Sequence, residues 1–138
     1  MLANGAKLAY KKKEAEEEEF KDLPGLKEIP DMGVEAEKVD NTTLTDPHKK
    51  YEMGIGDLPE MTYKFKYENK TAESPYRVLR DAQKAGEVLS FKETLKDGTE
   101  TEFDAQVSVK RTGAGVNGVI EFEVTMTVQS DLKYKDPV

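Results

Sequence analysis

Acidic side chains recur at every second position along two stretches of this chain. They are Glu100, Glu102, Asp104, Glu121 and Glu123. Residues i and i+2 of a β-strand share one face, so each stretch would place its carboxylates side by side. Paired carboxylates at a set separation within a cleft carry out glycoside hydrolysis. A solvated strand face produces the same spacing without any cleft, and we favour that interpretation.

Histidine and cysteine chemistry is scarce. The chain has one histidine, His48 between Pro47 and Lys49, and no cysteine. A lone histidine cannot build a multi-histidine zinc site, and thiolate or disulfide chemistry is absent. Oxygen side chains from Asp40 to Asp46 lack the spacing and the glycine of an EF-hand loop, and a turn explains them. We therefore expect no catalytic residue, no metal and no cofactor.

A glycine motif that resembles a phosphate-binding loop has the wrong surroundings. Gly113-Ala-Gly115-Val-Asn-Gly118 fits G-x-G-x-x-G, but it lies between two strand patterns and no helix follows it. Dinucleotide binding uses a helix N-terminus to hold the pyrophosphate. The motif is therefore interpreted as a connection between strands.

The elements that carry these residues are mostly strands. Apolar and polar residues alternate along 61–67, 88–95, 100–110 and 120–129, the pattern of half-buried strands. Asp97-Gly98 is a strong hairpin signal between the second and third stretches. The apolar positions are Tyr63, Phe65, Tyr67, Leu89, Phe91, Leu95, Thr101, Phe103, Ala105, Val107, Val109, Ile120, Phe122, Val124, Met126 and Val128.

One helix is predicted between the first and second strand patterns. Ser74 suits the N-cap, Pro75 the first helical position and Gly86 the position after the end. An apolar stripe of Val78, Leu79, Ala82 and Ala85 should lie flat on a sheet.

The N-terminal half is less regular. Residues 6–10 and 20–26 are short apolar segments around the charged run Lys11 to Glu19, which favours either a hairpin with a solvated tip or a short exposed helix. From Lys27 to Pro59 the pattern indicates mostly loop, with no sustained period. Such a long connection is unusual in a compact domain, so we interpret it as an arm ordered by a partner, with plain disorder as the alternative.

Composition limits the possible functions. The 138 residues suit one domain, and 28 acidic against 21 basic residues give a net charge of −7, which disfavours tight nucleic-acid binding. Met1 is not followed by an apolar signal sequence, and no apolar run reaches 18 residues, so we expect a soluble product made in the bacterial cytoplasm without a membrane anchor. The predicted fold class is mainly β, an antiparallel sandwich or open barrel with one flanking helix. Its exposed sheet edges would invite pairing with other chains.

With these residues considered, the chain resembles the siphophage tail tube proteins, in particular the short major tail proteins of phages and prophages of Gram-positive bacteria. The resemblance runs nearly end to end. It is carried by the segments Leu23–Gly33, Glu37–Asp46, Ala85–Phe91, Phe103–Val109, Gly113–Asn117 and Val128–Asp131.

The resemblance implies a structural virion protein and no enzyme. Six copies would form a ring, and rings would stack into a tube through which DNA is ejected without specific binding. Implied partners are further copies of the chain, a tape measure protein and a tail terminator. A single tail tube domain would span 1–138, with an extended loop at about 38–60 that reaches a neighbouring subunit. The candidate contact residues in that loop are Asp40, Leu44, His48, Tyr51, Met53, Ile55 and Leu58.

Our mechanistic hypothesis assigns the five acids to the tube wall, with some of them facing the lumen, where negative charge repels phosphate and keeps DNA sliding. Two other functions remain open. One is a monomeric β-sandwich binding module with an aromatic platform from Tyr51, Tyr63, Phe65 or Tyr67. The other is a tube subunit of a contractile injection or type VI secretion system.

Overall fold

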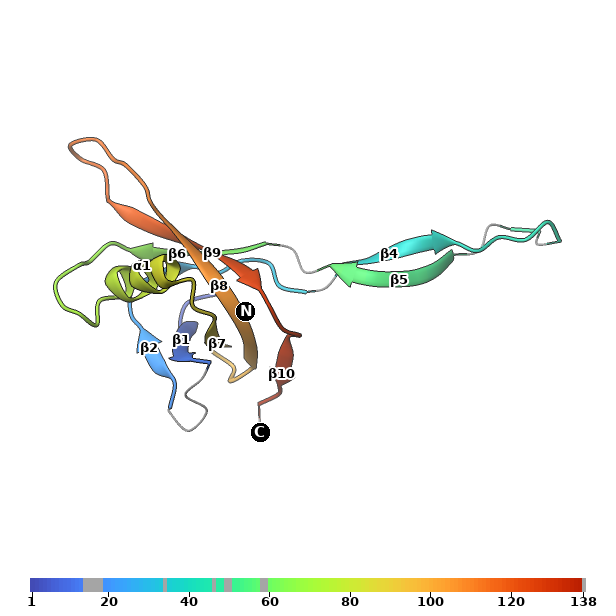
Figure 1. The fold of residues 1–138 in the computed structure, drawn as a ribbon, viewed down its shortest axis with the longest axis horizontal. Helices are drawn as coiled ribbons and strands as arrows, with labels where there is room; N and C mark the ends of the chain where they lie inside the picture. The colour runs from blue at the N-terminus through green and yellow to red at the C-terminus, as the bar shows by residue number, and fades with distance from the viewer. Residues whose placement is uncertain (14–18, 34, 46, 49–50, 58–59, 138) are drawn as a thin grey trace.

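A curled antiparallel sheet and one helix form the body of the protein, and a two-stranded arm projects from it (Figure 1). The computed structural model describes residues 1–13, 19–33, 35–45, 47–48, 51–57 and 60–137; of residues 35–39 and 51–57 it describes the backbone alone. The elements, in chain order, are β1 (Lys7–Lys12), β2 (Lys21–Leu23), β3 (Leu26–Glu28), β4 (Glu35–Asp40), β5 (Tyr51–Asp57), β6 (Met61–Lys66), α1 (Pro75–Ala85), β7 (Leu89–Thr94), β8 (Glu100–Arg111), β9 (Glu121–Val128) and β10 (Lys133–Lys135).

The main sheet has the strand order β2-β1-β7-β8-β9-β6-β3. Its two outermost strands, β2 and β3, are joined directly by Pro24 and Gly25, so the sheet must curl to bring its ends together. The carbonyl of Gly25 accepts the Lys66 N–H at 2.8 Å, which holds this corner against β6. The result is an open barrel with one flanking helix, and the fold class expected from the sequence is confirmed.

The core fills the inside of this barrel. Alternation along β6, β8 and β9 places one apolar set inward, and burying such side chains is the main driving force for folding. The buried apolar cluster comprises Leu8, Leu23, Met61, Tyr63, Phe65, Leu79, Ala82, Leu89, Phe91, Phe103, Ala105, Val107, Phe122, Val124 and Met126. Two expected members lie elsewhere: Ile120 precedes β9 and is 44% exposed, and Leu95 is in the turn after β7.

The helix α1 has the predicted ends. Pro75 is its first residue, and Gly86 follows it with φ +66°, its N–H bonded to the Gln83 carbonyl. Leu79 and Ala82 are buried, whereas Ala85 is exposed, so the apolar stripe is one residue shorter than expected. The Ser74 side chain accepts hydrogen bonds from the N–H groups of Lys70 and Thr71, so it ties down the preceding loop instead of capping the helix.

Strand β8 organises the sheet. It pairs with β7 over residues 100–105 and with β9 over residues 105–111, and β10 pairs with residues 100–102. The predicted Asp97-Gly98 turn connects β7 to β8: Gly98 has φ +97°, and Asp97 Oδ1 accepts the Thr99 N–H.

The N-terminal half holds more strand than the sequence predicted. β1 and β2 pair antiparallel, which fits the hairpin alternative; residues 14–18 of the charged run lie outside the described residues. Within the expected loop from Lys27 to Pro59, β4 and β5 pair antiparallel, and the sequence analysis predicted neither strand. The two strands pair with each other and not with the main sheet, and Figure 1 shows this arm extending well beyond the body.

Candidate functional site

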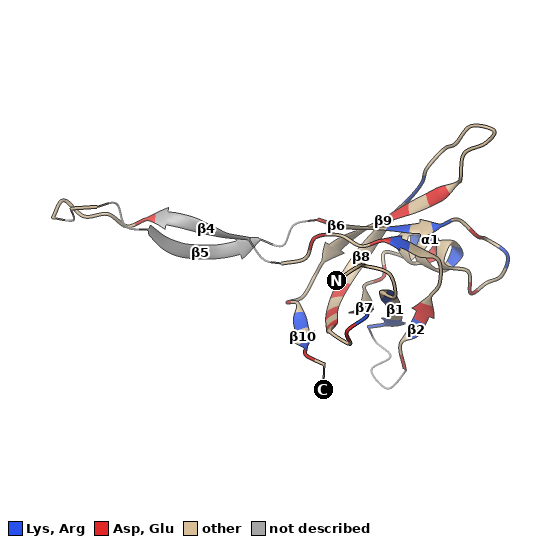
Figure 2. Cartoon of the chain, turned by 180° about the vertical axis from the view of Figure 1, so that it is seen from behind, with Lys and Arg blue, Asp and Glu red and all other residues tan. Residues whose placement is uncertain are grey.

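The five acids of the sequence pattern lie on the outer face of the barrel wall. On β8 and β9 the inward positions belong to the core, so the alternate positions point outward. All five are half-buried, and acidic segments are visible in red along both strands in Figure 2. We call Glu100, Glu102, Asp104, Glu121 and Glu123 the strand-face acids.

The two acids on β9 have lysine partners on neighbouring strands. Glu121 Oε1 lies 3.3 Å from Lys27 Nζ. Lys64 Nζ lies 4.0 Å from Glu123 Oε1 and 3.6 Å from Glu28 Oε2. Cross-strand register also sets Lys66 opposite Glu121 and Lys110 opposite Glu123. Opposite charges on neighbouring strands attract, so this part of the wall is charge-compensated.

The acids on β8 also lie near lysine side chains or opposite lysines on neighbouring strands. Asp104 accepts the Ser90 hydroxyl at 2.6 Å and has Lys13 Nζ at 4.0 Å. Register sets Lys92 and Lys133 opposite Glu102, and Lys135 opposite Glu100. A shallow cavity of about 130 Å³ beside Glu102 and Asp104 is also lined by Lys11 and Lys133. Carboxylates paired with lysines on an outer wall fit a solvated surface better than a proton-transfer site.

One carboxyl group lies buried in the core, where the sequence pattern did not predict it. Glu93 on β7 is 6% exposed and accepts a 2.5 Å hydrogen bond from the Tyr63 hydroxyl inside the barrel. Burial raises the pKa of the Glu93 carboxyl, while the Tyr63 hydrogen bond lowers it. Its position two residues after the inward Phe91 was the available signal, since Glu93 must share that face.

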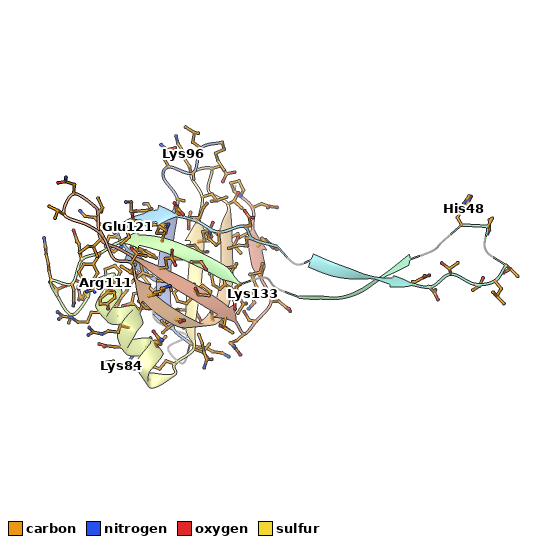
Figure 3. The ribbon with its side chains drawn as sticks, turned by 90° about the horizontal axis from the view of Figure 1, so that it is seen from above. His48, Lys84, Lys96, Arg111, Glu121 and Lys133 are labelled. Atoms are coloured by element: carbon orange, nitrogen blue, oxygen red, sulfur yellow. The ribbon has the colours of Figure 1, made fainter. Side chains whose placement is uncertain are left out.

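Three candidate contact residues, Asp40, Leu44 and His48, lie at the end of β4 and in the connection between β4 and β5. Leu44 is fully exposed, and His48 lies at the tip (Figure 3). Asp40 ends β4 and accepts the Thr42 N–H, and its hydrogen bonds to Thr42 lower the pKa of its carboxyl.

The other four candidate contact residues come later in the chain than His48. Tyr51, Met53 and Ile55 lie on β5, where the backbone is described, and Leu58 falls outside the described residues.

The aromatic platform proposed for a binding module is wrong for two of its members. Tyr63 and Phe65 are fully buried, and Phe65 stacks on Phe122 at 5.2 Å. Tyr67 is half-buried with its ring against Tyr76. These rings pack the core and its flank.

The described parts of the chain hold neither a metal-binding cluster nor a membrane-spanning helix. No group of three or more acidic or histidine side chains there could hold a metal ion. In the same residues, no helix is long and apolar enough to cross a membrane.

The described residues thus form a curled antiparallel sheet with one flanking helix, an outer face of paired charges and a projecting hairpin. Residues 15–135 match the family described as "Phage tail tube protein, TTP". The chain therefore belongs to the phage tail tube protein family, which is a family of virion tail proteins. No curated protein matches the chain.

Solved structures share the fold. The tail of an empty gene transfer agent particle, reconstructed with C6 symmetry, is 22% identical over 94% of this chain and 95% of that chain, with a TM-score of 0.69. The SPP1 tail tube is 12% identical over 100% of this chain and 80% of that chain, with a TM-score of 0.72. A baseplate chain of the anti-feeding prophage is 7% identical over 99% and 95% of the two chains, with a TM-score of 0.69.

Proposed function

We propose that this chain is one tail tube domain with a projecting arm, and that six copies form a ring that stacks into the conduit for DNA. The observation that carries the proposal is the arm, whose described strands pair with each other and not with the main sheet, and whose Leu44 is fully exposed. A two-stranded ribbon alone is marginally stable in water, so it needs another surface. Another copy of the chain can supply one.

The sheet edges support the same proposal. β2 and β3 end the main sheet, and neither has an outer strand partner among the described strands. The pairing of β7 with β8 ends at Ala105, so residues 106–111 of β8 have no described strand on that edge. In this part of β8, the Gln83 side chain of α1 accepts the Val109 N–H at 2.9 Å. Edges of this kind favour pairing with further chains.

The strand-face acids would contribute to the tube wall, some of them facing the lumen. Their lysine partners reduce the net negative charge of that wall, so DNA would meet a charge-paired surface with hydroxyl groups such as the hydrogen-bonded Thr62 and Thr125. Such a surface offers few unpaired cations for phosphate, so DNA would pass without specific binding. The other proposed partners are a tape measure protein and a tail terminator, and no catalytic role is proposed.

A contractile-injection tube subunit is the second candidate, since chains of the anti-feeding prophage and of an extracellular contractile injection system share the fold. The family match favours the phage tail.

Negative-stain microscopy of the purified chain across a concentration series, with and without its tail terminator, tests the proposal. We expect rings or tubes of uniform width. A chain that stays monomeric at every concentration with the terminator present would contradict it.

A further inference from the structure

The connection between β8 and β9 is an exposed apolar knob. Val116 is fully exposed, Val119 is 62% exposed and Ile120 is 44% exposed. Figure 1 shows the loop standing out beyond the ends of β8 and β9. We call residues 112–120 the loop knob.

The loop knob differs from the rest of the surface in composition. Residues 112–120 carry no charged side chain, in a chain of which 36% is charged. The loop is also shaped by its own hydrogen bonds: the Gly118 N–H reaches the Gly115 carbonyl at 3.0 Å, and the Thr112 N–H reaches the Glu121 carbonyl at 2.8 Å. Clustered exposed apolar side chains on a hydrogen-bonded support are typical of a contact site.

A groove of matching chemistry lies at the barrel corner. Its volume is about 310 Å³, and its apolar lining includes Leu8, Leu23, Pro24 and Leu26. Lys7 and Asp22, of opposite charge, also line it. An apolar cavity of about 150 Å³ can hold a benzene-sized molecule, so this groove has room for the valine side chains of a knob.

From these two features we infer that the loop knob of one copy inserts into the β2–β3 corner groove of a neighbouring copy. This rests on the proposed tube function. Each copy carries both halves of the contact, and a contact between two different surfaces of identical chains propagates into rings or filaments.

The size of the contact fits assembly in a polymer and not a free dimer. A stable pair of proteins buries roughly 800 Å² on each partner, from about 20 to 30 residues a side. Three apolar side chains supply far less. The knob contact therefore forms alongside other contacts within the ring, and isolated copies remain separate in dilute solution.

Charge placed on the knob tests the inference. We expect Val116→Asp to raise the protein concentration needed for tube formation at least about tenfold, because burying a valine contributes about that factor or more. Val116→Ile keeps the apolar character and should assemble like the unchanged chain. Circular dichroism and thermal unfolding should not change for either variant, since the side chain is exposed in the single copy.

Disulfide trapping gives a second readout that does not depend on assembly being lost. The chain has no cysteine, so a Val116→Cys, Leu26→Cys double variant can be oxidised in assembled tubes. We expect a ladder of covalent multimers on a non-reducing gel, and none from a matched Val116→Cys, Lys84→Cys variant.

The outcomes separate this inference from the proposed function. The knob contact is wrong if Val116→Asp assembles at the same concentration as the unchanged chain and the cysteine pair gives no ladder. Tubes formed by the unchanged chain would still support the tube function. If the unchanged chain never assembles, both are wrong.

Discussion

At the residue scale, the burial of the Glu93 carboxyl beside Tyr63 predicts that the stability of the barrel depends on pH. Burial raises the pKa of Glu93 above its ordinary value of 4.5, against a smaller opposite effect of the Tyr63 hydrogen bond. The folded state therefore holds the proton more tightly than the unfolded chain. The stabilisation is fully present below the unfolded pKa and is lost as the pH rises through the folded pKa.

We predict that Glu93→Gln removes this pH dependence. The glutamine carbonyl can still accept the Tyr63 hydroxyl, and no carboxylate has to ionise in the core. Relative to the unchanged chain, the variant should gain stability as the pH rises from 4 to 8 in urea unfolding experiments.

The matched control is Glu87→Gln, since Glu87 is exposed. Its unfolding free energy should follow that of the unchanged chain at every pH. Parallel curves for Glu93→Gln and the unchanged chain would show that the carboxyl does not titrate with folding.

At the element scale, the end of α1 depends on a backbone conformation. Gly86 has φ +66°, and a Cβ there would meet no atom within 4 Å. A side chain at this position is therefore costly through backbone strain and not through a clash. We predict that Gly86→Ala lowers the free energy of unfolding by about 1–2 kcal/mol in chemical denaturation.

Gly113→Ala provides the comparison. Gly113 also has open space around it, and it is absent from the glycines with positive φ. Its substitution should leave stability unchanged or raise it by up to about 1 kcal/mol. Equal losses for the two variants would contradict the role assigned to the left-handed conformation.

Elements whose ends are fixed by their own residues were predictable from sequence. Elements that lack such local signals were not. The helix ends followed from Pro75 and Gly86, and the β7–β8 turn from Asp97-Gly98, because these residues constrain their own backbone. The strands β4 and β5 were not predicted because glycines and prolines in and around them indicated loop, although Tyr51, Met53 and Ile55 alternate along β5. Glu93 was missed because an acid on an inward face runs against the expected pattern.

The site could be predicted only in part. The spacing placed the strand-face acids on one side of their strands. The lysines near them come from β3, β6, β7, β8 and β10, and from Lys13 directly after β1. Such pairing depends on strand order and register, which local spacing does not encode.

At the scale of the whole molecule, the body and the arm should be separable. β4 and β5 form a two-stranded sheet of their own, separate from the main sheet. We predict that replacing residues 35–57 with a short glycine-serine turn leaves the thermal unfolding temperature of the body within a few degrees of that of the full chain. The same variant should fail to form tubes. A large loss of stability would show that the arm is part of the fold of each single copy.

The central claim is that copies of this chain assemble into stacked rings through surfaces that a single copy leaves unpaired. Cryo-electron microscopy of the assembled tubes tests it most directly. We predict six copies in each ring, with every arm lying against another copy and strand-face acids on the inner wall. A reconstruction with each arm folded back on its own body, or with all five strand-face acids on the outside of the tube, would contradict it.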